Sequence, residues 1–434
     1  MVVGAARTAI GDFGGALKSH EPVSLAAIVI REALSRARVD GDDVGHVVFG
    51  QVIHTTARDM YLPRVAAMTA GVTLNAPAFS VNRLCGSGLQ AVLSAAQSIL
   101  LGDTDVAVAG GAESMSRAGY LSEDLRWGKR MGNGVMTDML LGALTDPFGQ
   151  YHMGVTAEHV AKRYGIGRDQ QDRLAEQSHA RAAHAIEQGY FKTQIVPIQV
   201  RSAGAGAGAR AGAGAASKPS ADARTPSASN AMQASADAHG NATSNALAMR
   251  ADDGWFDTDE HVRADMSLHA LAQRKPAFID DGTVTAGNAS SLNDGAAALV
   301  LMEREVAQHR GLPCLGRLVA YAHAGVDPAY MGMGPVPATR AVLDRAGLTL
   351  ADIDVIEANE AFAAQACAVA QALAFDPDRL NPNGSGIALG HPIGATGAIL
   401  VVKALYELQR IQGRFALVTM CIGGGQGIAA IFER

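Results

Sequence analysis

The sequence of 434 residues is poor in cysteine, in aromatic residues and in charge. Its four cysteines include no CxxC pair, which argues against a disulfide framework and against a zinc or thiol-exchange site. Charged residues make up only 18%, and the net charge of -6 offers no general attraction to nucleic acid or to an anionic membrane. No run reaches the roughly 18 to 20 apolar residues of a membrane span, and no secretory signal opens the chain. We therefore expect a cytoplasmic protein with no nucleic-acid or membrane partner.

The apolar content of the chain is high, with 48% hydrophobic residues. At this length, the sequence favours two hydrophobic cores or one large duplicated architecture. The main break in composition is the segment 201–250, which is mostly alanine, glycine and serine without helical or strand periodicity. Such a segment cannot offset its ordering entropy by burying apolar surface, and we expect a mobile surface insertion there.

Outside that insertion, stretches with helical periodicity alternate with short β-rich runs. This alternation predicts an α/β protein whose sheets are covered by helices. The expected helices are Pro22–Ala37, Leu89–Leu101, Gly154–Gln188, Ala338–Ala346, Phe362–Leu373 and Thr396–Ile411. The expected strands are Val44–Val52, Asp105–Ala109, Ala296–Met302, Val355–Ala358 and Phe415–Cys421.

Two parts of the sequence, 76–115 and 380–427, resemble each other weakly. Each shows the pattern of a short strand, a glycine turn, a long helix, a strand and a second glycine turn. Cys85 and His391 fall at comparable positions, each in the turn before the central helix of its half. A duplicated fold would bring these two turns together at the junction of the halves.

Cys85 lies in the turn NRLCGSG, directly ahead of an apolar helix. Unpaired N–H groups and the macrodipole at a helix N-terminus stabilise a thiolate, and the glycines let a substrate carbonyl approach the backbone. A lone cysteine in an apolar protein is more often a small core residue. The glycine-rich turn favours a nucleophile instead.

His391 lies in GHPIGATG and also precedes an apolar helix. Its ring can donate to a developing oxyanion or accept the proton of a thiol, and a capping or merely hydrogen-bonded histidine is the alternative. Asn359, in EANEAF, stands between an expected strand and an expected helix. It is either a helix cap or an amide that holds a water or orients the histidine.

Cys421 ends an apolar run and precedes three consecutive glycines in CIGGGQG. The backbone N–H groups of such glycines can face an oxyanion, and a second cysteine can transfer protons. Cys314 and Cys367 lack a setting of this kind, and we interpret both as structural.

Six motifs taken together resemble those of the thiolase family. In chain order they are NRLCGSG, YHMG, TAGNAS, NEAFAAQ, GHPIGATGA and CIGGGQG, and they are spread over the whole chain except the insertion. No single motif is decisive, but six in the correct order are specific. The chain resembles in particular the bacterial β-ketothiolases, or acetyl-CoA C-acyltransferases, of polyhydroxyalkanoate-forming organisms.

The resemblance implies a thiolase fold, which is a duplicated five-layer α/β/α/β/α core with a loop domain inserted into the first half. Residues 1–119 would form the first half, and residues 120–252, including the insertion, would form the loop domain. Residues 253–303 would end the loop domain and return to the first half, and residues 304–434 would form the second half. The segment 125–138 resembles the family's tetramerisation loop, which implies a homotetramer built as a dimer of dimers.

The resemblance also implies reversible Claisen condensation and thiolysis of short-chain 3-ketoacyl-CoA through a cysteine acyl-enzyme. Acyl-CoA, acetyl-CoA and coenzyme A would bind as substrates, and neither a cofactor nor a metal is implied. Cys85 matches the family's nucleophile, Cys421 its acid/base, and His391 with a water held by Asn359 one oxyanion hole. The N–H groups of Cys85 and Gly423 would form a second hole. The coenzyme A channel would be lined by Leu144, His152, Met153, Arg263 (at the adenine), Phe278, Ala286, Ser290 (at the pantetheine), Ala361 and Phe362.

Three features depart from the family pattern. Ser291 stands where a glycine is usual, the first strand begins late and is expected to be short, and the insertion lies near the expected coenzyme A entrance. Three rival interpretations remain: a β-ketoacyl synthase-like condensing enzyme, a non-catalytic thiolase-like lipid-binding protein and a nucleotide-dependent oxidoreductase. The last depends on GSGIALG at 384–390, a weak phosphate-loop signal. The second cysteine of CIGGGQG disfavours the synthase, and the presence of Cys85, His391 and Cys421 together disfavours the non-catalytic relative.

Overall fold

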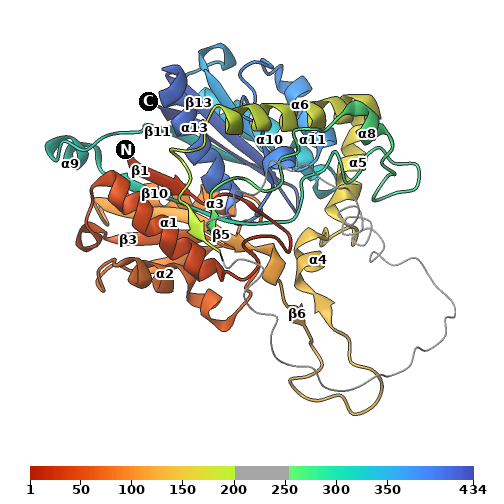
Figure 1. The fold of residues 1–434 in the computed structure, drawn as a ribbon, viewed down its shortest axis with the longest axis horizontal. Helices are drawn as coiled ribbons and strands as arrows, with labels where there is room; N and C mark the ends of the chain where they lie inside the picture. The colour runs from red at the N-terminus through yellow and green to blue at the C-terminus, as the bar shows by residue number, and fades with distance from the viewer. Residues whose placement is uncertain (201–253) are drawn as a thin grey trace.

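Two sheets form the centre of the molecule (Figure 1). The computed structural model describes residues 1–200 and 254–434, so the insertion predicted at 201–250 lies outside the described residues. The first sheet has the order β1-β10-β5-β3-β4 with β2 beside β10, and the second has the order β11-β14-β13-β12. The strands of the first sheet are β1 Val2–Arg7, β2 Gly11–Asp12, β3 His46–Gly50, β4 Ala78–Val81, β5 Val106–Ser114 and β10 Asn293–Met302. Those of the second sheet are β11 Arg317–Gly325, β12 Val355–Ala358, β13 Phe415–Ile422 and β14 Gln426–Glu433.

Helices complete five layers around these sheets. Helices α1 (Pro22–Ala37) and α2 (Leu62–Ala70) cover the outer face of the first sheet, and α10 (Pro335–Ala346) with α11 (Ala363–Leu373) cover the outer face of the second. Helices α3 (Ser87–Leu100) and α13 (Thr396–Ile411) lie between the two sheets and share one hydrophobic cluster with both inner faces. The predicted α/β/α/β/α arrangement is therefore confirmed.

The two central helices pack against each other at their N-terminal ends. A Cβ atom at Gly88 on α3 would lie 2.7 Å from the backbone nitrogen of Ala398 on α13, and a Cβ atom at Gly397 would overlap the backbone nitrogen of Leu89. Only glycine permits so close an approach of two helix backbones. Because each helix follows one of the candidate turns, this contact brings the turns of Cys85 and His391 together, as the internal repeat predicts.

The chain returns to the first sheet after the segment that contains the insertion. Strand β10 lies between β1 and β5, pairs antiparallel with both, and is buried along its whole length. The first strand, expected to be short, has six residues, all buried. The predicted domain boundaries at 119, 252 and 303 stay predictions.

The region between the halves contains short strands and helices. They are the hairpin β6 (Tyr120–Leu121) with β7 (Thr137–Asp138), the pair β8 (Ile198–Gln199) with β9 (Trp255–Phe256), and the helices α4 (Met139–Leu144), α5 (Met153–Tyr164), α6 (Arg168–Glu187) and α8 (Leu268–Ala272). The single helix expected at Gly154–Gln188 is wrong, because Gly165, in the left-handed conformation, ends α5 and a new helix begins at Arg168. Within the described residues, no helix is long and apolar enough to cross a membrane.

Candidate active site

The turn that carries Cys85 is closed by its own polar side chains. The Asn82 side-chain oxygen accepts the N–H of Leu84 at 3.0 Å, and the Ser87 hydroxyl donates to the Leu84 carbonyl at 2.6 Å while it accepts the N–H of Arg83 at 2.9 Å. Leu84 itself has a φ of 44°, a left-handed conformation that is rare for a leucine. The chain therefore turns sharply before α3 and presents Cys85, which is partly buried, to the cavity.

The thiol of Cys85 is not stabilised as a thiolate in this structure, contrary to the expectation from its place at a helix N-terminus. Burial raises its pKa to about 11, although hydrogen bonds from the backbone N–H groups of Gly423 and of Cys85 itself oppose the shift. Desolvation of the charged form outweighs these donors. The thiol is therefore protonated at neutral pH, and nucleophilic attack requires a base that takes its proton.

His391 is a neutral imidazole that lines the same cavity as Cys85. It is 5% exposed, and burial lowers its pKa to about 4. Its Nδ1 lies 2.6 Å from the Thr396 hydroxyl oxygen, and this hydroxyl donates to the Pro392 carbonyl at 3.0 Å. Because the hydroxyl has a single proton, Nδ1 carries the ring proton and Nε2 is left with a lone pair. The backbone N–H of His391 donates to the Asn293 side-chain oxygen at 2.8 Å, which fixes the turn.

Asn359 lies against the other ring nitrogen. Its Nδ2 is 3.4 Å from Nε2 of His391, and its side-chain oxygen is buried with no partner among the described residues. The alternative that Asn359 or His391 is a helix cap is wrong, because the N-caps of α11 and α13 are Phe362 and Ala395. The amide is thus in place to orient the histidine and to bind a small polar group.

Cys421 is the second-to-last residue of β13 and lines the same cavity. It is 1% exposed, and burial raises its pKa. A thiolate at Cys85 raises the pKa of Cys421 further, an effect that requires the two sulfur atoms to lie near each other. The backbone N–H of Gly423 points at the Cys85 thiol. Two thiols, an imidazole and the backbone of Gly423 therefore line one cavity.

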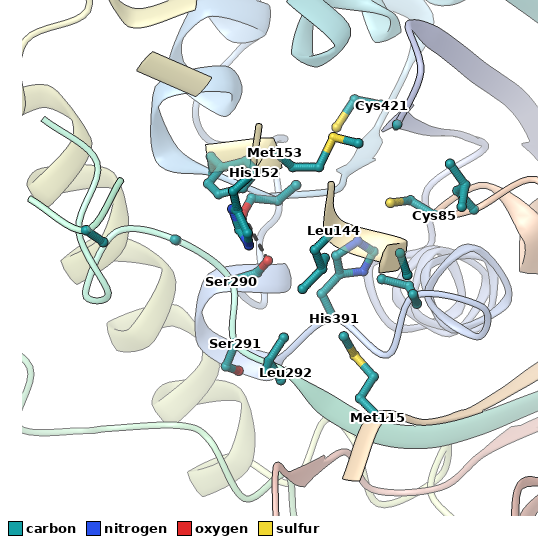
Figure 2. A pocket seen from close by; sticks show the side chains of 18 of the residues that line it. Cys85, Met115, Leu144, His152, Met153, Ser290, Ser291, Leu292, His391 and Cys421 are labelled. Carbon is teal, nitrogen blue, oxygen red and sulfur yellow. Dashed lines mark hydrogen bonds between the residues drawn. The ribbon is translucent and has the colours of Figure 1, made fainter. Parts of the chain in front are cut away.

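One cavity is lined by these groups and by eight of the nine residues predicted for the coenzyme A channel (Figure 2). The imidazole of His152 stacks on the ring of Phe278, with centroids 4.7 Å apart, and Phe278 meets Phe362 edge to face at 6.0 Å. Arg263 is not among the lining residues, and its predicted contact with adenine stays a prediction. The eight lining residues are Leu144, His152, Met153, Phe278, Ala286, Ser290, Ala361 and Phe362.

Further lining residues had no sequence signal strong enough to select them. Ser291, noted only as a departure from the family pattern, lines the cavity, and its hydroxyl donates to the Asn293 oxygen at 2.8 Å. Three of the further lining residues, Leu84, Ala289 and Ile393, lie inside the motifs NRLCGSG, TAGNAS and GHPIG. Ser291 and Leu292 directly follow TAGNAS, so the motifs could have found these five residues, but nothing in the sequence marks the others. The lining residues that were missed are Phe13, Leu84, Met115, Ala143, His261, Ala277, Ala289, Ser291, Leu292, Met331 and Ile393.

Two other sequence features take no part in this cavity. Cys314 and Cys367 do not line it. The segment of GSGIALG from 386 to 389 forms one short, fully buried helix, α12 (Gly386–Leu389), rather than an open loop after a strand. The interpretation as a phosphate loop, and with it the oxidoreductase alternative, is therefore wrong.

Comparison with known proteins agrees with this geometry. Residues 1–222 and 226–305 match the family model of the thiolase N-terminal domain, and residues 312–434 match that of the thiolase C-terminal domain. The whole chain is 60% identical to the beta-ketothiolase BktB of Cupriavidus necator, covering 98% of it, and 44% identical to an acetyl-CoA acetyltransferase of Pseudomonas aeruginosa, covering 99%. A Bacillus anthracis acetyl-CoA acetyltransferase is similar in structure, with a TM-score of 0.86 and 41% identity over 100% of this chain and 98% of that chain. The human mitochondrial 3-ketoacyl-CoA thiolase in complex with CoA has a TM-score of 0.86 and 35% identity over 100% and 97%.

Proposed function

This chain belongs to the thiolase family, and we propose that it is an acyl-CoA:acetyl-CoA C-acyltransferase that forms and cleaves short-chain 3-ketoacyl-CoA. One observation carries the proposal: Cys85, His391, Cys421 and Gly423 line a single cavity whose other walls are mostly apolar and aromatic. A nucleophile, a neutral base, a second thiol and backbone donors together are what acyl transfer between thioesters requires.

In the first half-reaction, Cys85 Sγ attacks the carbonyl carbon of acyl-CoA while its proton passes to Nε2 of His391. The carbonyl oxygen becomes an oxyanion near the N–H groups of Cys85 and Gly423, each worth about 3 to 4 kcal/mol of barrier. The bond to the coenzyme A sulfur then breaks, and the Cys421 thiol protonates the departing thiolate. The products are an acyl-enzyme on Cys85, a Cys421 thiolate and an imidazolium at His391.

In the second half-reaction, the Cys421 thiolate removes a proton from the α-carbon of acetyl-CoA. The resulting enolate oxygen accepts a hydrogen bond from Nε2–H of His391 and from a small polar group held by Asn359. The enolate carbon attacks the acyl carbon on Cys85, the carbon–sulfur bond breaks, and the Cys85 thiolate recovers its proton from His391. Protons balance over the cycle, and the reverse sequence is thiolysis by coenzyme A.

The cavity walls support binding of the coenzyme A part of the substrate. Phe278 and His152 form a stacked pair, and Ser290 donates to the Ala361 carbonyl at 2.9 Å, which connects the segment TAGNAS to the turn NEAF. Apolar and aromatic walls suit the methylene-rich pantetheine, and a few polar groups fix its orientation. Arg263 at the adenine completes the proposal for this channel.

The proposal extends to assembly and location: a cytoplasmic homotetramer. The loop between β6 and β7 projects from the molecule (Figure 1), and its apolar side chains are unusually exposed, with Trp127 at 90% and Met131 at 89%. Large exposed apolar side chains on one loop favour contact with other subunits. Trp127→Glu should convert tetramers to dimers in analytical ultracentrifugation, and an unchanged tetramer would contradict this assignment of the loop.

The activity is tested by coenzyme A-dependent cleavage of acetoacetyl-CoA and 3-ketovaleryl-CoA. The intact protein should cleave both, the Cys85→Ser variant should cleave neither, and the ratio of the two rates gives the chain-length preference. A folded protein that cleaves neither substrate would overturn the proposal in favour of a carrier-dependent synthase or a non-catalytic relative.

A further inference from the structure

A carboxylate outside the reacting groups joins the two halves of the candidate site. Glu113, near the end of β5, is completely buried. Its Oε2 accepts the backbone N–H of Gly394 at 2.9 Å and that of Val52 at 3.0 Å, and its Oε1 accepts that of Ile53 at 3.2 Å. Val52 and Ile53 follow β3 in the first half, whereas Gly394 belongs to the turn of His391 in the second. One side chain thus binds two segments that are more than 300 residues apart.

The position of Gly394 leaves little room for movement. A Cβ atom there would lie 2.5 Å from the Glu113 carboxylate. On the other side, the Gly394 carbonyl oxygen packs against two glycines of the first sheet. A Cβ atom at Gly50 would lie 2.7 Å from this oxygen, and a Cβ atom at Gly111 would lie closer still. Residue 394 is therefore fixed on one side by the hydrogen bond from its N–H to Glu113. On the other side its carbonyl oxygen packs against two glycines of the first sheet. The adjacent residue, Ile393, lines the cavity.

The bonding pattern favours an ionised carboxylate. All three backbone N–H groups donate to its oxygens, and hydrogen bonds to an ionised acceptor are stronger than those to a neutral acid. Burial nevertheless raises the pKa of Glu113 to about 8, opposed by the three N–H groups and increased further by Asp59. The other titratable neighbour is Cys85, whose own pKa is raised in part by Glu113. On β10 the residue paired with Glu113 is Gly295, and the last residue of β3 is Gly50, which pairs with Gly111; neither Gly295 nor Gly50 carries an ionisable side chain.

We propose that Glu113 is a positioning residue of the acyl-transfer site: its carboxylate fixes the His391 turn against the first half, so that Nε2 of His391 meets the Cys85 thiol. Glu113 touches neither substrate nor reacting atom and acts through Gly394. This inference rests on the proposed thiolase function. Because the ionised carboxylate binds the turn more strongly than the neutral acid does, we expect activity to fall as the pH drops through about 8.

The first test is Glu113→Gln, which keeps the shape but replaces one acceptor oxygen by a donor. We expect kcat for acetoacetyl-CoA cleavage to fall on the order of tenfold to a hundredfold, because a displaced catalytic turn costs that much. KM for coenzyme A should stay within about twofold, since the predicted channel residues lie on other segments. The fall in activity below pH 8, present in the wild type, should disappear from the variant's profile.

The matched control is Glu357→Gln. Glu357 is also fully buried with a raised pKa, but its carboxylate binds the Lys403 ammonium at 2.7 Å and does not line the cavity. This variant should lose stability and keep the wild-type pH profile of kcat. If both variants show the same profile, Glu113 has only a structural role and the proposal is wrong.

A second readout does not depend on turnover. Alkylation of Cys85 by iodoacetamide, followed by mass spectrometry of its peptide, reports thiolate formation as a function of pH. Glu113→Gln removes a nearby negative charge, so its alkylation midpoint should move to lower pH. Glu113→Asp keeps the charge but falls short of Gly394, so it should keep the wild-type midpoint while kcat falls.

These readouts separate the two proposals. Unchanged kcat and an unchanged profile in Glu113→Gln would overturn the positioning role, even in an active enzyme. A wild-type protein that cleaves no 3-ketoacyl-CoA would overturn the thiolase function. In that case an unshifted Cys85 alkylation midpoint in Glu113→Gln would overturn the inference as well, and a midpoint shifted to lower pH would support the placement of Glu113 beside the nucleophile.

Discussion

The Nδ1 atom of His391 lies 2.6 Å from the hydroxyl oxygen of Thr396. The two residues are five apart, across the start of α13, so the helix that carries Thr396 also sets the tautomer of the histidine. With Nδ1–H bound to the hydroxyl, Nε2 keeps the lone pair that, in the proposed mechanism, accepts a proton from Cys85 and returns it later. In the proposed mechanism the tautomer of His391 thus depends on a hydroxyl that does not line the cavity.

Thr396→Val should reduce kcat, because it leaves Nδ1–H buried without an acceptor and no longer selects the tautomer. An unpaired buried donor costs about 1 to 3 kcal/mol, so a loss on the order of tenfold or more is expected. Steady-state cleavage of acetoacetyl-CoA measures it. Thr396→Ser, which keeps the hydroxyl, serves as the control and should remain close to wild type. Equal activity in the Val and Ser variants would show that the hydroxyl does not matter.

Cys421→Ala should separate the two half-reactions. Cys85 and His391 are intact in this variant, so acetyl-CoA can still acylate Cys85, although more slowly, because the departing coenzyme A thiolate takes its proton from the His391 imidazolium instead of from Cys421. No thiolate is then available to remove the α-proton of a second acetyl-CoA. We expect label from radioactive acetyl-CoA to remain on the protein while condensation falls on the order of a hundredfold or more. Cys85→Ser, examined in parallel, should lose the stable label. Full condensation activity in Cys421→Ala would assign the acid/base role to another group.

The juxtaposition of Cys85 and His391 could be predicted because two local patterns repeat in the sequence. Each turn precedes an apolar helix followed by a strand, and the bounds of Thr396–Ile411 and Val355–Ala358 agree with the structure. The repeat failed in one detail. The strand expected near Leu380 is a single bridge to Ile356, because the chain there turns into the short buried helix α12.

What the sequence did not predict depends on contacts between distant segments. The helix-end argument for Cys85 considers one helix, whereas its pKa is set mainly by the protein packed around the thiol. Met115 and Ile393 lie in different halves and meet at the cavity in one apolar cluster, which no motif or periodicity indicates. Glu113 likewise has no marker in the sequence. Its role becomes visible only when the loop after β3 and the turn of Gly394 are seen around one carboxylate.

Phe278→Ala should weaken coenzyme A binding more than it slows chemistry. The ring stacks on His152 and meets Phe362 edge to face, and neither partner is one of the proposed reacting groups. Aromatic contacts of this kind are worth about 0.5 to 1.5 kcal/mol, so KM for coenzyme A should rise about threefold to tenfold while kcat changes little. Phe148→Ala removes an exposed ring outside the cavity and should leave both constants unchanged. A fall in kcat at constant KM would contradict the assignment of Phe278 to the channel.

His179 gives the protein a component of acid sensitivity that can be isolated by mutation. The residue is 2% exposed on α6, and its Nδ1 accepts the backbone N–H of Arg263 at 3.2 Å. Burial, with smaller contributions from His261 and Arg263, lowers its pKa to about 3. An unfolded chain binds a proton at this histidine below about pH 6.5, but the folded protein does not until about pH 3.

The stability that a neutral His179 contributes is therefore complete above about pH 6.5 and is lost as the pH falls towards 3. Buried glutamates with raised pKa values, such as Glu113 and Glu357, have the opposite pH dependence, so total stability is not the informative quantity. The informative quantity is the difference in free energy of unfolding between wild type and His179→Gln, because both proteins contain the same glutamates. Urea unfolding at pH 7, 6 and 5 should show the variant gaining on the wild type by about 1 kcal/mol per pH unit below 6.5. His269→Gln, at an exposed position, should run parallel to the wild type. A constant difference between His179→Gln and wild type over this range would mean that His179 is not held neutral in the folded protein.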